Sequence, residues 1–392
     1  MFLSIVFDFF KLNSVNRFFI LLFSSISIFL SIASVAFSSD LKSFFSFDNK
    51  EHPYIQFKIN DGRVGIVASG FGGTYLRIAS DIKSVVDSNK PNKRIRVVPM
   101  INRGSLEAIL DVRHLKATEM GIMQADVMEE VKELATTGNE TAQDLVERVK
   151  YITKLYDEEV HLIGRGVTRI GELDGRRVNV GAIGSGTKFT AEIILKRMEI
   201  KPSEQTTYSP ALALEKLRNG EIDAMFFVVG KPAPLLLKIG EDKKRDSAIG
   251  LVDIAFDKDK IGAPYVSSII TDKDYPNLSD RYVETLAVPA ILAVYHFTDQ
   301  RRKNNVNRFS KAFVKNIKKL YQGAASEGKI YHKKWIEFVH RDYLNQEVSG
   351  WSRYEPMQEI LDQTRPEKVS SNCSDAEVRV GIDTKKCSNY TQ

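Results

Sequence analysis

Short apolar runs alternate with stretches of helical periodicity between residues 64 and 295. Each run is short enough for one buried strand, and the stretches between the runs repeat an apolar residue at every third or fourth position. Strands that alternate with helices in this way are typical of an α/β protein with mainly parallel sheets. The predicted strands cover residues 64–68, 95–98, 120–123, 161–163, 177–180, 224–229, 251–256 and 289–295.

Helices fill the intervals between these strands. The predicted helices cover residues 74–86, 105–115 and 141–156. The last one has a continuous apolar face, formed by Leu145, Val149, Ile152 and Tyr156.

The last third of the chain changes character, because strand patterns fade while helical ones continue. One apolar helix face is formed by Phe309, Phe313, Ile317 and Leu320. Further helices are predicted over 335–343 and 355–361. We therefore expect a helical carboxy-terminal section that packs on the α/β body.

One kind of junction recurs: an apolar strand, then small Gly, Ser or Thr residues, then the start of a helix. Clear copies lie at 69–75 and 181–187, and a weaker one lies at 102–105. Such a junction directs backbone N–H groups and the positive end of a helix dipole into the same space. Copies from separate parts of the chain predict a cleft whose walls both offer sites for a carboxylate or phosphate.

The balance of charge does not indicate a nucleic-acid partner. The net charge is +6 and the pI is near 9, spread over 392 residues. The densest basic stretches, 315–319 and 333–334, lie on predicted amphipathic helices and lack the interleaved aromatic residues that stack on bases. We interpret them as solvated helix faces.

The amino terminus has the pattern of an export signal. Lys11 and Arg17 precede an apolar run over 18–32, and Ser34-Val35-Ala36 supplies the small residues that a signal peptidase reads. Residues 1–36 are predicted as a signal peptide cleaved after Ala36, or as an uncleaved membrane anchor. An extension over 37–61 follows, and the mature chain is expected to be a soluble exported protein.

The cysteines, Cys373 and Cys387, lie in a polar tail over 366–392. An exported chain meets an oxidising compartment, so the pair is predicted to form a disulfide. Closing a loop of this length would stabilise the fold by about 3 kcal/mol. A metal pair is disfavoured because no histidine lies nearby.

The candidate catalytic and nucleotide-binding motifs in the sequence are incomplete. The glycines after residue 69 lack the third glycine of a dinucleotide fingerprint, and Thr187-Lys188 reverses the Lys-Thr order of a P-loop. Ile183 stands where a nucleophile elbow needs glycine. The histidines are scattered, and Glu158-Glu159 is interpreted as a solvated pair. The sequence thus predicts a binding protein, not an enzyme, with no cofactor.

Several motifs, in order, resemble the TAXI-type solute receptors of TRAP (tripartite ATP-independent periplasmic) transporters. The first is Gly-Phe-Gly-Gly-Thr-Tyr at 70–75, and the resemblance covers roughly residues 62–295. Leu76, Ala79 and Ala108 depart from the family's usual pattern. The further matching motifs lie at 103–107, 121–127, 181–187, 217–227 and 230–234.

The resemblance implies a type II periplasmic-binding-protein-like fold, in which two α/β lobes joined by a hinge hold a ligand in their cleft. Lobe 1 would cover 62–157 and return over 293–365, with lobe 2 over 158–292. The ligand would be a small organic anion, such as glutamate, 2-oxoglutarate or a C4 dicarboxylate, delivered to an ion-driven TRAP permease.

The expected site combines the junctions with this resemblance. Backbone N–H groups of two triplets, one on each lobe, would hold the ligand carboxylate, aided by the hydroxyls of Thr74 and Ser185. Gln124 would orient an amide or amino group, Arg103 or Lys188 would neutralise an acid, and Tyr75 would form an apolar wall or pack in the core. Asp126 would meet a ligand ammonium or cap the next helix. The expected site residues are Gly72, Gly73, Thr74, Tyr75, Arg103, Gly104, Ser105, Gln124, Asp126, Ser185, Gly186, Thr187, Lys188 and Gly230.

Two other functions are compatible with the same fold. An uncleaved anchor and the cysteine-bearing tail would suit a sensory or scaffolding binding protein without a transport role. An enzyme would need a reactive side chain in the cleft, for which Lys188 is the only weak candidate.

Overall fold

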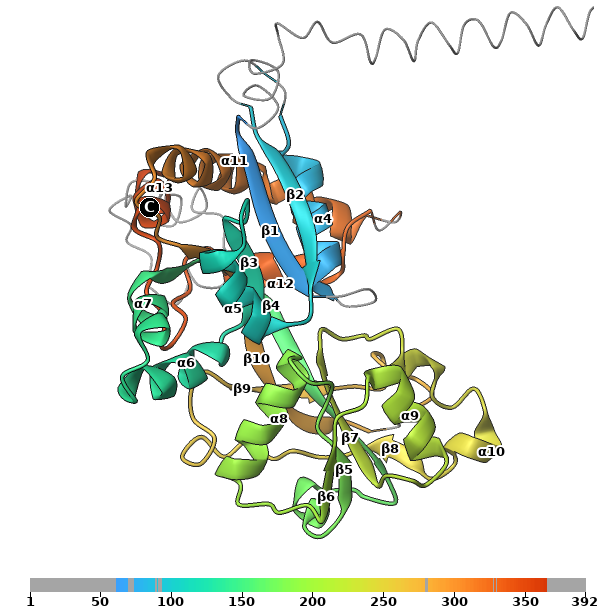
Figure 1. Cartoon of the computed structure of the whole chain (residues 1–392). Coiled ribbons are helices and arrows are strands. Elements are labelled where there is room, and N and C mark those ends of the chain that lie inside the picture. The colour runs from blue at the N-terminus through green and yellow to red at the C-terminus, as the bar shows by residue number, and fades with distance from the viewer. Residues whose placement is uncertain are drawn as a thin grey trace, which may run out of the picture. The chain divides into compact units, whose positions relative to one another are not determined.

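The computed structural model describes residues 61–69, 74–88, 90, 94–278, 281–326, 328 and 330–364, with the backbone alone at 339–341 (Figure 1). The chain divides into two units, Met1–Asp61 and Gly62–Gln392. The predicted signal segment, the predicted extension up to residue 60, and both cysteines lie outside the described residues.

A mixed sheet runs through the second unit in the order β2-β1-β3-β10-β4-β7-β5-β6, with β8 beside β4 and β9 beside β10. Strands that are followed by helices pair in parallel, as in β2-β1-β3 and in β7-β5-β6, whereas β4 and β10 pair antiparallel with their neighbours. The strands are β1 (Arg63–Ser69), β2 (Arg96–Asn102), β3 (Met120–Gln124), β4 (Val149–Arg165), β5 (Arg177–Asn179), β6 (Glu204–Thr206), β7 (Ala224–Val229), β8 (Ile249–Leu251), β9 (Val266–Ile270) and β10 (Val283–Tyr295).

Helices cover the sheet and form the carboxy-terminal section (Figure 1). The long helix α11 buries the apolar face that the sequence predicts, including Phe309 and Phe313. The helices are α4 (Thr74–Val86), α5 (Ser105–His114), α6 (Val127–Thr136), α7 (Glu140–Arg148), α8 (Gly186–Arg197), α9 (Pro210–Arg218), α10 (Lys243–Asp246), α11 (Gln300–Ala325), α12 (Lys334–Arg341) and α13 (Glu355–Thr364), with 3₁₀ turns η1 (Ile170–Leu173) and η2 (Leu236–Lys238).

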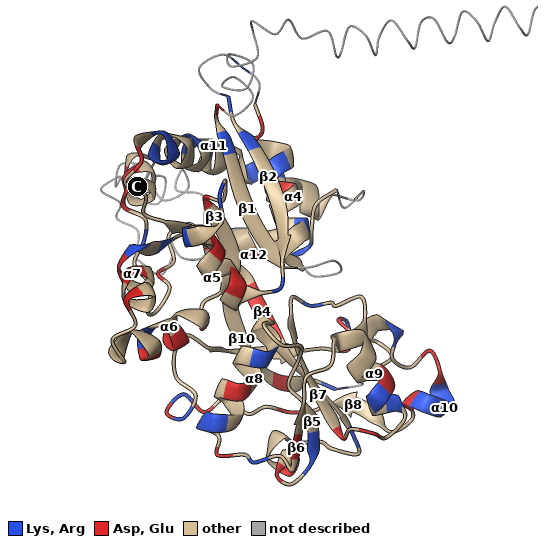
Figure 2. Cartoon of the chain, in the orientation of Figure 1, with Lys and Arg blue, Asp and Glu red and all other residues tan. Residues whose placement is uncertain are grey.

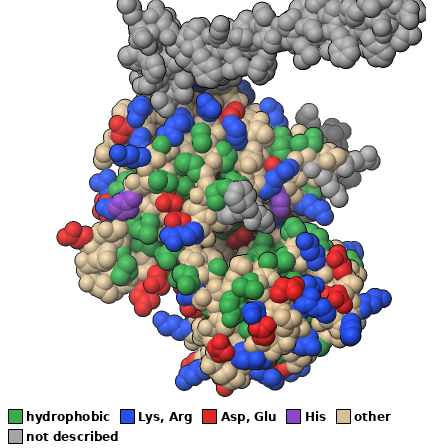
Figure 3. Space-filling model, turned by 45° about the vertical axis from the view of Figure 1, so that its right-hand side comes forward, with side chains coloured by type: hydrophobic (Ala, Val, Ile, Leu, Met, Phe, Trp, Pro, Cys, Tyr) green, Lys and Arg blue, Asp and Glu red, His purple; other side chains and the backbone are tan. Residues whose placement is uncertain are grey.

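Two long strands, β4 and β10, join two separately packed lobes. On β4, Tyr156 belongs to the core of lobe 1 and Val160 to the core of lobe 2. On β10, Ala290 packs in lobe 1 and Val288 in lobe 2. The structure therefore confirms a two-lobed α/β fold of the type II periplasmic-binding-protein kind, and its surface is indented between the lobes (Figure 3).

Two predicted elements are wrong in part. The helix predicted over 141–156 ends at Arg148, and β4 begins at Val149. Because β4 is buried on both faces, it carries apolar residues at odd and even positions, and some of them fall by chance at helical spacing. Of the strand predicted over 251–256, only the first residue lies in a strand, because β8 ends at Leu251.

Other predicted elements are confirmed. The helix over 74–86 has the predicted bounds, and the strands over 64–68, 120–123 and 224–229 match within one residue at each end. Among the described residues, no helix is both long and apolar enough to span a bilayer.

Candidate functional site

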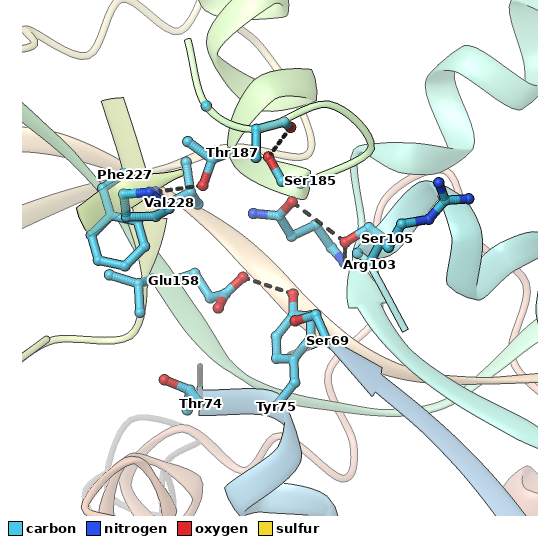
Figure 4. A pocket seen from close by; sticks show the side chains of 17 residues that line it. Ser69, Thr74, Tyr75, Arg103, Ser105, Glu158, Ser185, Thr187, Phe227 and Val228 are labelled. Carbon is cyan, nitrogen blue, oxygen red and sulfur yellow. Dashed lines mark hydrogen bonds between the residues drawn. The ribbon is translucent and has the colours of Figure 1, made fainter. Parts of the chain in front are cut away.

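A pocket of about 140 Å³ lies between the lobes, where α4, α5 and α8 begin (Figure 4). Space of this size can hold a molecule on the scale of benzene. Many of the predicted site residues come together here: Thr74, Tyr75, Arg103, Gly104, Ser105, Gln124, Ser185, Gly186 and Thr187. Residues that the sequence did not single out also line it, among them Ser69, Glu158, Phe227 and Val228.

The lobes approach each other closely beside this pocket, and glycine permits the approach. A Cβ on Gly104 of lobe 1 would lie 2.5 Å from the carbonyl oxygen of Gly184 in lobe 2. A Cβ on Gly186 would lie 1.7 Å from Oε1 of Gln124. Neither position can carry a side chain without separating the lobes or moving Gln124.

The start of α8 is held by its own side chains. Ser185 Oγ accepts a hydrogen bond from the Lys188 amide at 3.2 Å and donates one to the Ala182 carbonyl at 2.7 Å. Thr187 Oγ1 accepts from the Val228 amide at 3.1 Å. These hydroxyls therefore shape the loop, and the first N–H groups of α8, which have no partner within the helix, are left as candidate donors.

Glu158 lies at the pocket, buried on the strand that joins the lobes. The hydroxyl of Tyr75 donates to its Oε2 at 2.7 Å, and that of Tyr156 donates to its Oε1 at 3.2 Å. Burial raises the pKa of Glu158 to about 8, although both tyrosine hydrogen bonds act to lower the pKa. The interpretation of Glu158-Glu159 as solvated is therefore wrong.

The neighbouring Glu159 is buried in a different network. Its Oε1 is 2.7 Å from Lys334 Nζ of α12, and its Oε2 accepts from the Lys231 amide at 2.9 Å. A Cβ on Gly230 would lie 3.1 Å from Lys334 Cε, so this glycine makes room for the lysine. Gly230 is not among the residues that line the pocket.

The two basic residues predicted at the site are paired with carboxylates of the protein. Arg103 stands at the rim, 79% exposed, with its guanidinium 3.0 Å from Glu107. Lys188 pairs with Glu192 at 2.5 Å and does not line the pocket. The pocket's described lining therefore contains one cation, at its edge.

Asp126 is buried and links the lobes instead of lining the pocket. Its Oδ2 accepts from Thr190 Oγ1 at 2.6 Å and from the Tyr265 hydroxyl at 2.9 Å. Asp126 holds the N-cap position of α6, as the capping alternative expected, but its carboxylate makes no capping hydrogen bond. Burial raises the pKa of Asp126 to about 6.

Gly72 and Gly73 lie outside the described residues, so the first predicted N–H triplet is represented by Thr74 alone. Within the described part of the chain, no group of three or more His, Cys, Asp or Glu side chains could hold a metal ion.

Glu158 is the main residue that the sequence interpretation missed. The available signal was weak: apolar residues recur at odd and even positions on both sides of the charged run 157–159, which fits a strand buried on both faces. A carboxylate in the middle of such a strand is buried with it.

Several solved structures resemble this chain at low sequence identity. The ligand-binding component of an ABC-type import system from Staphylococcus aureus is 13% identical, covering 76% of this chain and 89% of that one, with a TM-score of 0.40. The periplasmic binding protein BugD is 13% identical, with coverages of 77% and 93% and a TM-score of 0.40. A putative periplasmic sulfonate-binding protein, SsuA, from Methylobacillus flagellatus KT is 12% identical, with coverages of 77% and 84% and a TM-score of 0.39.

The family comparison is more extensive. A model of the NMT1-like family matches residues 66–339, which include lobe 2, most of lobe 1 and the strands that join them. The match covers well over half of the chain, and the chain therefore belongs to the NMT1-like family.

Proposed function

We propose that this chain is a solute-binding protein that captures a small organic anion between its lobes. The observation that carries the proposal is the convergence of three helix starts, Thr74 of α4, Ser105 of α5 and Gly186 of α8, on one pocket. Each helix directs partial positive charge and unpaired N–H groups toward its first residue. A carboxylate is the common biological group that such a surface favours.

The ligand carboxylate is assigned to the space between Ser105 and Gly186, where α5 and α8 begin on opposite lobes. Hydrogen bonds to a charged group contribute about 1.5–3 kcal/mol each. Four or five of them, less the costs of closure and desolvation, reach the roughly 8 kcal/mol of micromolar binding.

Glu158 adds a carboxyl group to the same pocket, apart from the N–H groups of the helix starts. A buried carboxyl that already accepts from two tyrosines is suited to a ligand group that bears a proton, such as an ammonium. Among the ligands that the sequence suggests, this favours an amino acid such as glutamate over 2-oxoglutarate or a C4 dicarboxylate. Figure 4 shows the carboxyl of Glu158 directed toward the hydroxyl of Tyr75.

Capture would depend on movement of the lobes about β4 and β10. Contacts between lobes, such as Arg197 with Glu129 at 2.5 Å, exist only when the lobes are together. A ligand held by donors from both lobes shifts the open–closed equilibrium toward the closed state. A membrane permease, which we propose to be of the TRAP type, could then distinguish loaded from empty receptor by shape.

Export is part of the proposal, because residues 1–36 carry the signal pattern. Amino-terminal sequencing of the exported protein tests it. A start at Phe37 supports a periplasmic receptor, and retention of Met1 indicates an anchored protein.

Titration calorimetry with glutamate, 2-oxoglutarate and succinate tests the binding function. We expect saturable binding of at least one of these anions, and a loss of more than tenfold in affinity for Gly186→Ala, because the new Cβ would collide with Gln124. Gly171→Ala is the matched control, because a Cβ at Gly171 would meet nothing within 4 Å. Absence of binding, or equal affinity of the two variants, would contradict the proposal.

A further inference from the structure

A second recess, distant from the interlobe pocket, lies between the end of α4 and the outer face of α11. Its volume is about 570 Å³, and apolar residues such as Val86 and Ala312 contribute to its lining. We call it the basic groove, because its other walls carry Lys90, Arg308, Lys311, Lys315 and Lys319. A smaller recess that shares Ser88 and Ile95 adds Arg94 and Arg96.

The basic residues of α11 carry most of this charge. Helix α11 contains eight Lys or Arg residues and no Asp or Glu between Gln300 and Ala325 (Figure 2). The only carboxylate that lines the groove in the described residues is Asp87, which pairs with Lys83 and accepts from the Val97 amide at 2.7 Å. In the part of the chain that the structure describes, Lys311, Lys315 and Lys319 have no ion-pair partner.

The spacing of these lysines gives no stability to the helix. Lys311, Lys315 and Lys319 follow one another at intervals of four residues, so like charges lie on one face. Such pairs repel one another and weaken a helix. An anionic partner outside the described residues would relieve the repulsion.

The groove lies near the first strand of the second unit. The Arg96 amide donates to the Gly62 carbonyl at 3.0 Å, and Asn305 Nδ2 of α11 donates to the Arg63 carbonyl at 3.2 Å. The start of β1 therefore contacts both β2 and α11, on which several of the basic residues lie.

We propose that the basic groove binds the headgroups of anionic phospholipids and holds lobe 1 against a membrane surface. Clustered lysines and arginines bind anionic headgroups, and the apolar floor suits the glycerol and the first methylenes of a lipid. An apolar floor beside the basic walls favours a lipid over an acidic protein as the partner.

Partitioning of the full chain into vesicles tests this proposal. One set of vesicles is phosphatidylcholine, and the other contains 30% phosphatidylglycerol. Residues 1–61 are carried into both sets, so the ratio of the two partition coefficients isolates the preference for anionic lipid. We expect a ratio on the order of 100 at low salt, falling steeply as salt is raised.

The triple variant Lys311→Gln, Lys315→Gln, Lys319→Gln should bring this ratio to within about tenfold of unity. Its matched control replaces Lys201, Lys258 and Lys273, which are exposed on lobe 2, with glutamine and changes the net charge equally. A ratio near one for the unchanged chain, or equal losses in both triple variants, would overturn the proposal. Binding to poly-glutamate without a preference for anionic vesicles would overturn it in favour of an acidic protein partner.

Discussion

The hydroxyl of Tyr75, at the start of α4, donates a 2.7 Å hydrogen bond to Glu158 on β4, 83 residues later in the chain. The two side chains are buried, and the ring of Tyr75 meets that of Tyr156 edge-on at 6.3 Å between centroids. The bond joins a helix start of the pocket to a strand on which the lobes would turn. It also places a titratable group in a pocket whose other described lining residues are neutral, apart from one exposed arginine.

The stability of the free protein should depend on pH through Glu158. Its pKa is raised to about 8 in the folded state from 4.5, because burial disfavours the charged form. The folded state therefore holds the proton more tightly than the unfolded state. This contribution to stability is complete below about pH 4.5 and is lost as the pH rises through about 8, by up to about 1.4 kcal/mol per pH unit.

Urea denaturation from pH 5 to pH 9 measures this effect. Because other groups also titrate, the informative quantity is the free energy of unfolding of the unchanged chain minus that of Glu158→Gln. We expect this difference to fall with rising pH. A difference that stays constant over the range would show that Glu158 is ionised throughout.

Ligand binding should release a proton from Glu158 or add one to it, and the direction of this exchange indicates the class of ligand. At pH 8 Glu158 holds about half a proton. A ligand ammonium beside it favours the carboxylate and releases that fraction, whereas a second carboxylate favours the acid and takes up a proton. Calorimetry in phosphate and in Tris buffers gives the sign, because the two buffers differ in ionisation enthalpy.

Glu158→Gln is the control for this exchange, since it keeps a hydrogen-bonding group of the same shape and removes the titration. The exchange should vanish in the variant. Proton uptake with glutamate, or an exchange that survives in Glu158→Gln, would rule out the ammonium assignment.

The sequence predicted one half of the pocket for a local reason. Small residues between β5 and α8 leave the helix start open, and Ser185 is a typical N-cap, so the position of Gly186 and Thr187 beside the pocket follows from neighbouring residues. The helix start at Thr74 was predictable in the same way.

Contacts between distant segments could not be predicted. The approach of Gly186 to Gln124 and the pairing of Lys334 with Glu159, 175 residues apart, depend on how the lobes pack. The predicted helix ended at residue 156 and the next predicted strand began at 161. Residues 157–160 were therefore expected to form a short loop with solvated carboxylates. A continuous strand buries them instead.

Breaking a single contact between lobes should weaken ligand binding without touching the pocket. Thr190→Val removes the hydroxyl that donates to Asp126 at 2.6 Å and keeps the shape of the side chain. A hydrogen bond to a charged group contributes about 1.5–3 kcal/mol, so the closed state should lose at least roughly tenfold in population. We expect a matching loss of affinity, with a larger radius of gyration of the loaded protein in X-ray scattering.

Thr168→Val is the matched control for this change. It removes a comparable bond, from Thr168 Oγ1 to Glu172 at 2.9 Å, that lies within lobe 2. If both variants lose affinity equally, or neither does, the contact at Asp126 does not contribute to closure.

Removing Lys334 alone should destabilise the protein more than removing the charges of both Lys334 and Glu159. Lys334→Met leaves Glu159 buried, with the Lys231 amide at 2.9 Å as its hydrogen-bond donor and no balancing cation at that place. Removing one partner of such a pair costs about 3–5 kcal/mol, because the remaining charge has left water without compensation. Adding Glu159→Gln removes that charge, so the double variant should recover much of the loss.

Urea denaturation of the two single variants and the double variant measures the coupling between Lys334 and Glu159. Additive losses would mean that the two side chains stabilise the protein independently, despite the 2.7 Å between Nζ and Oε1.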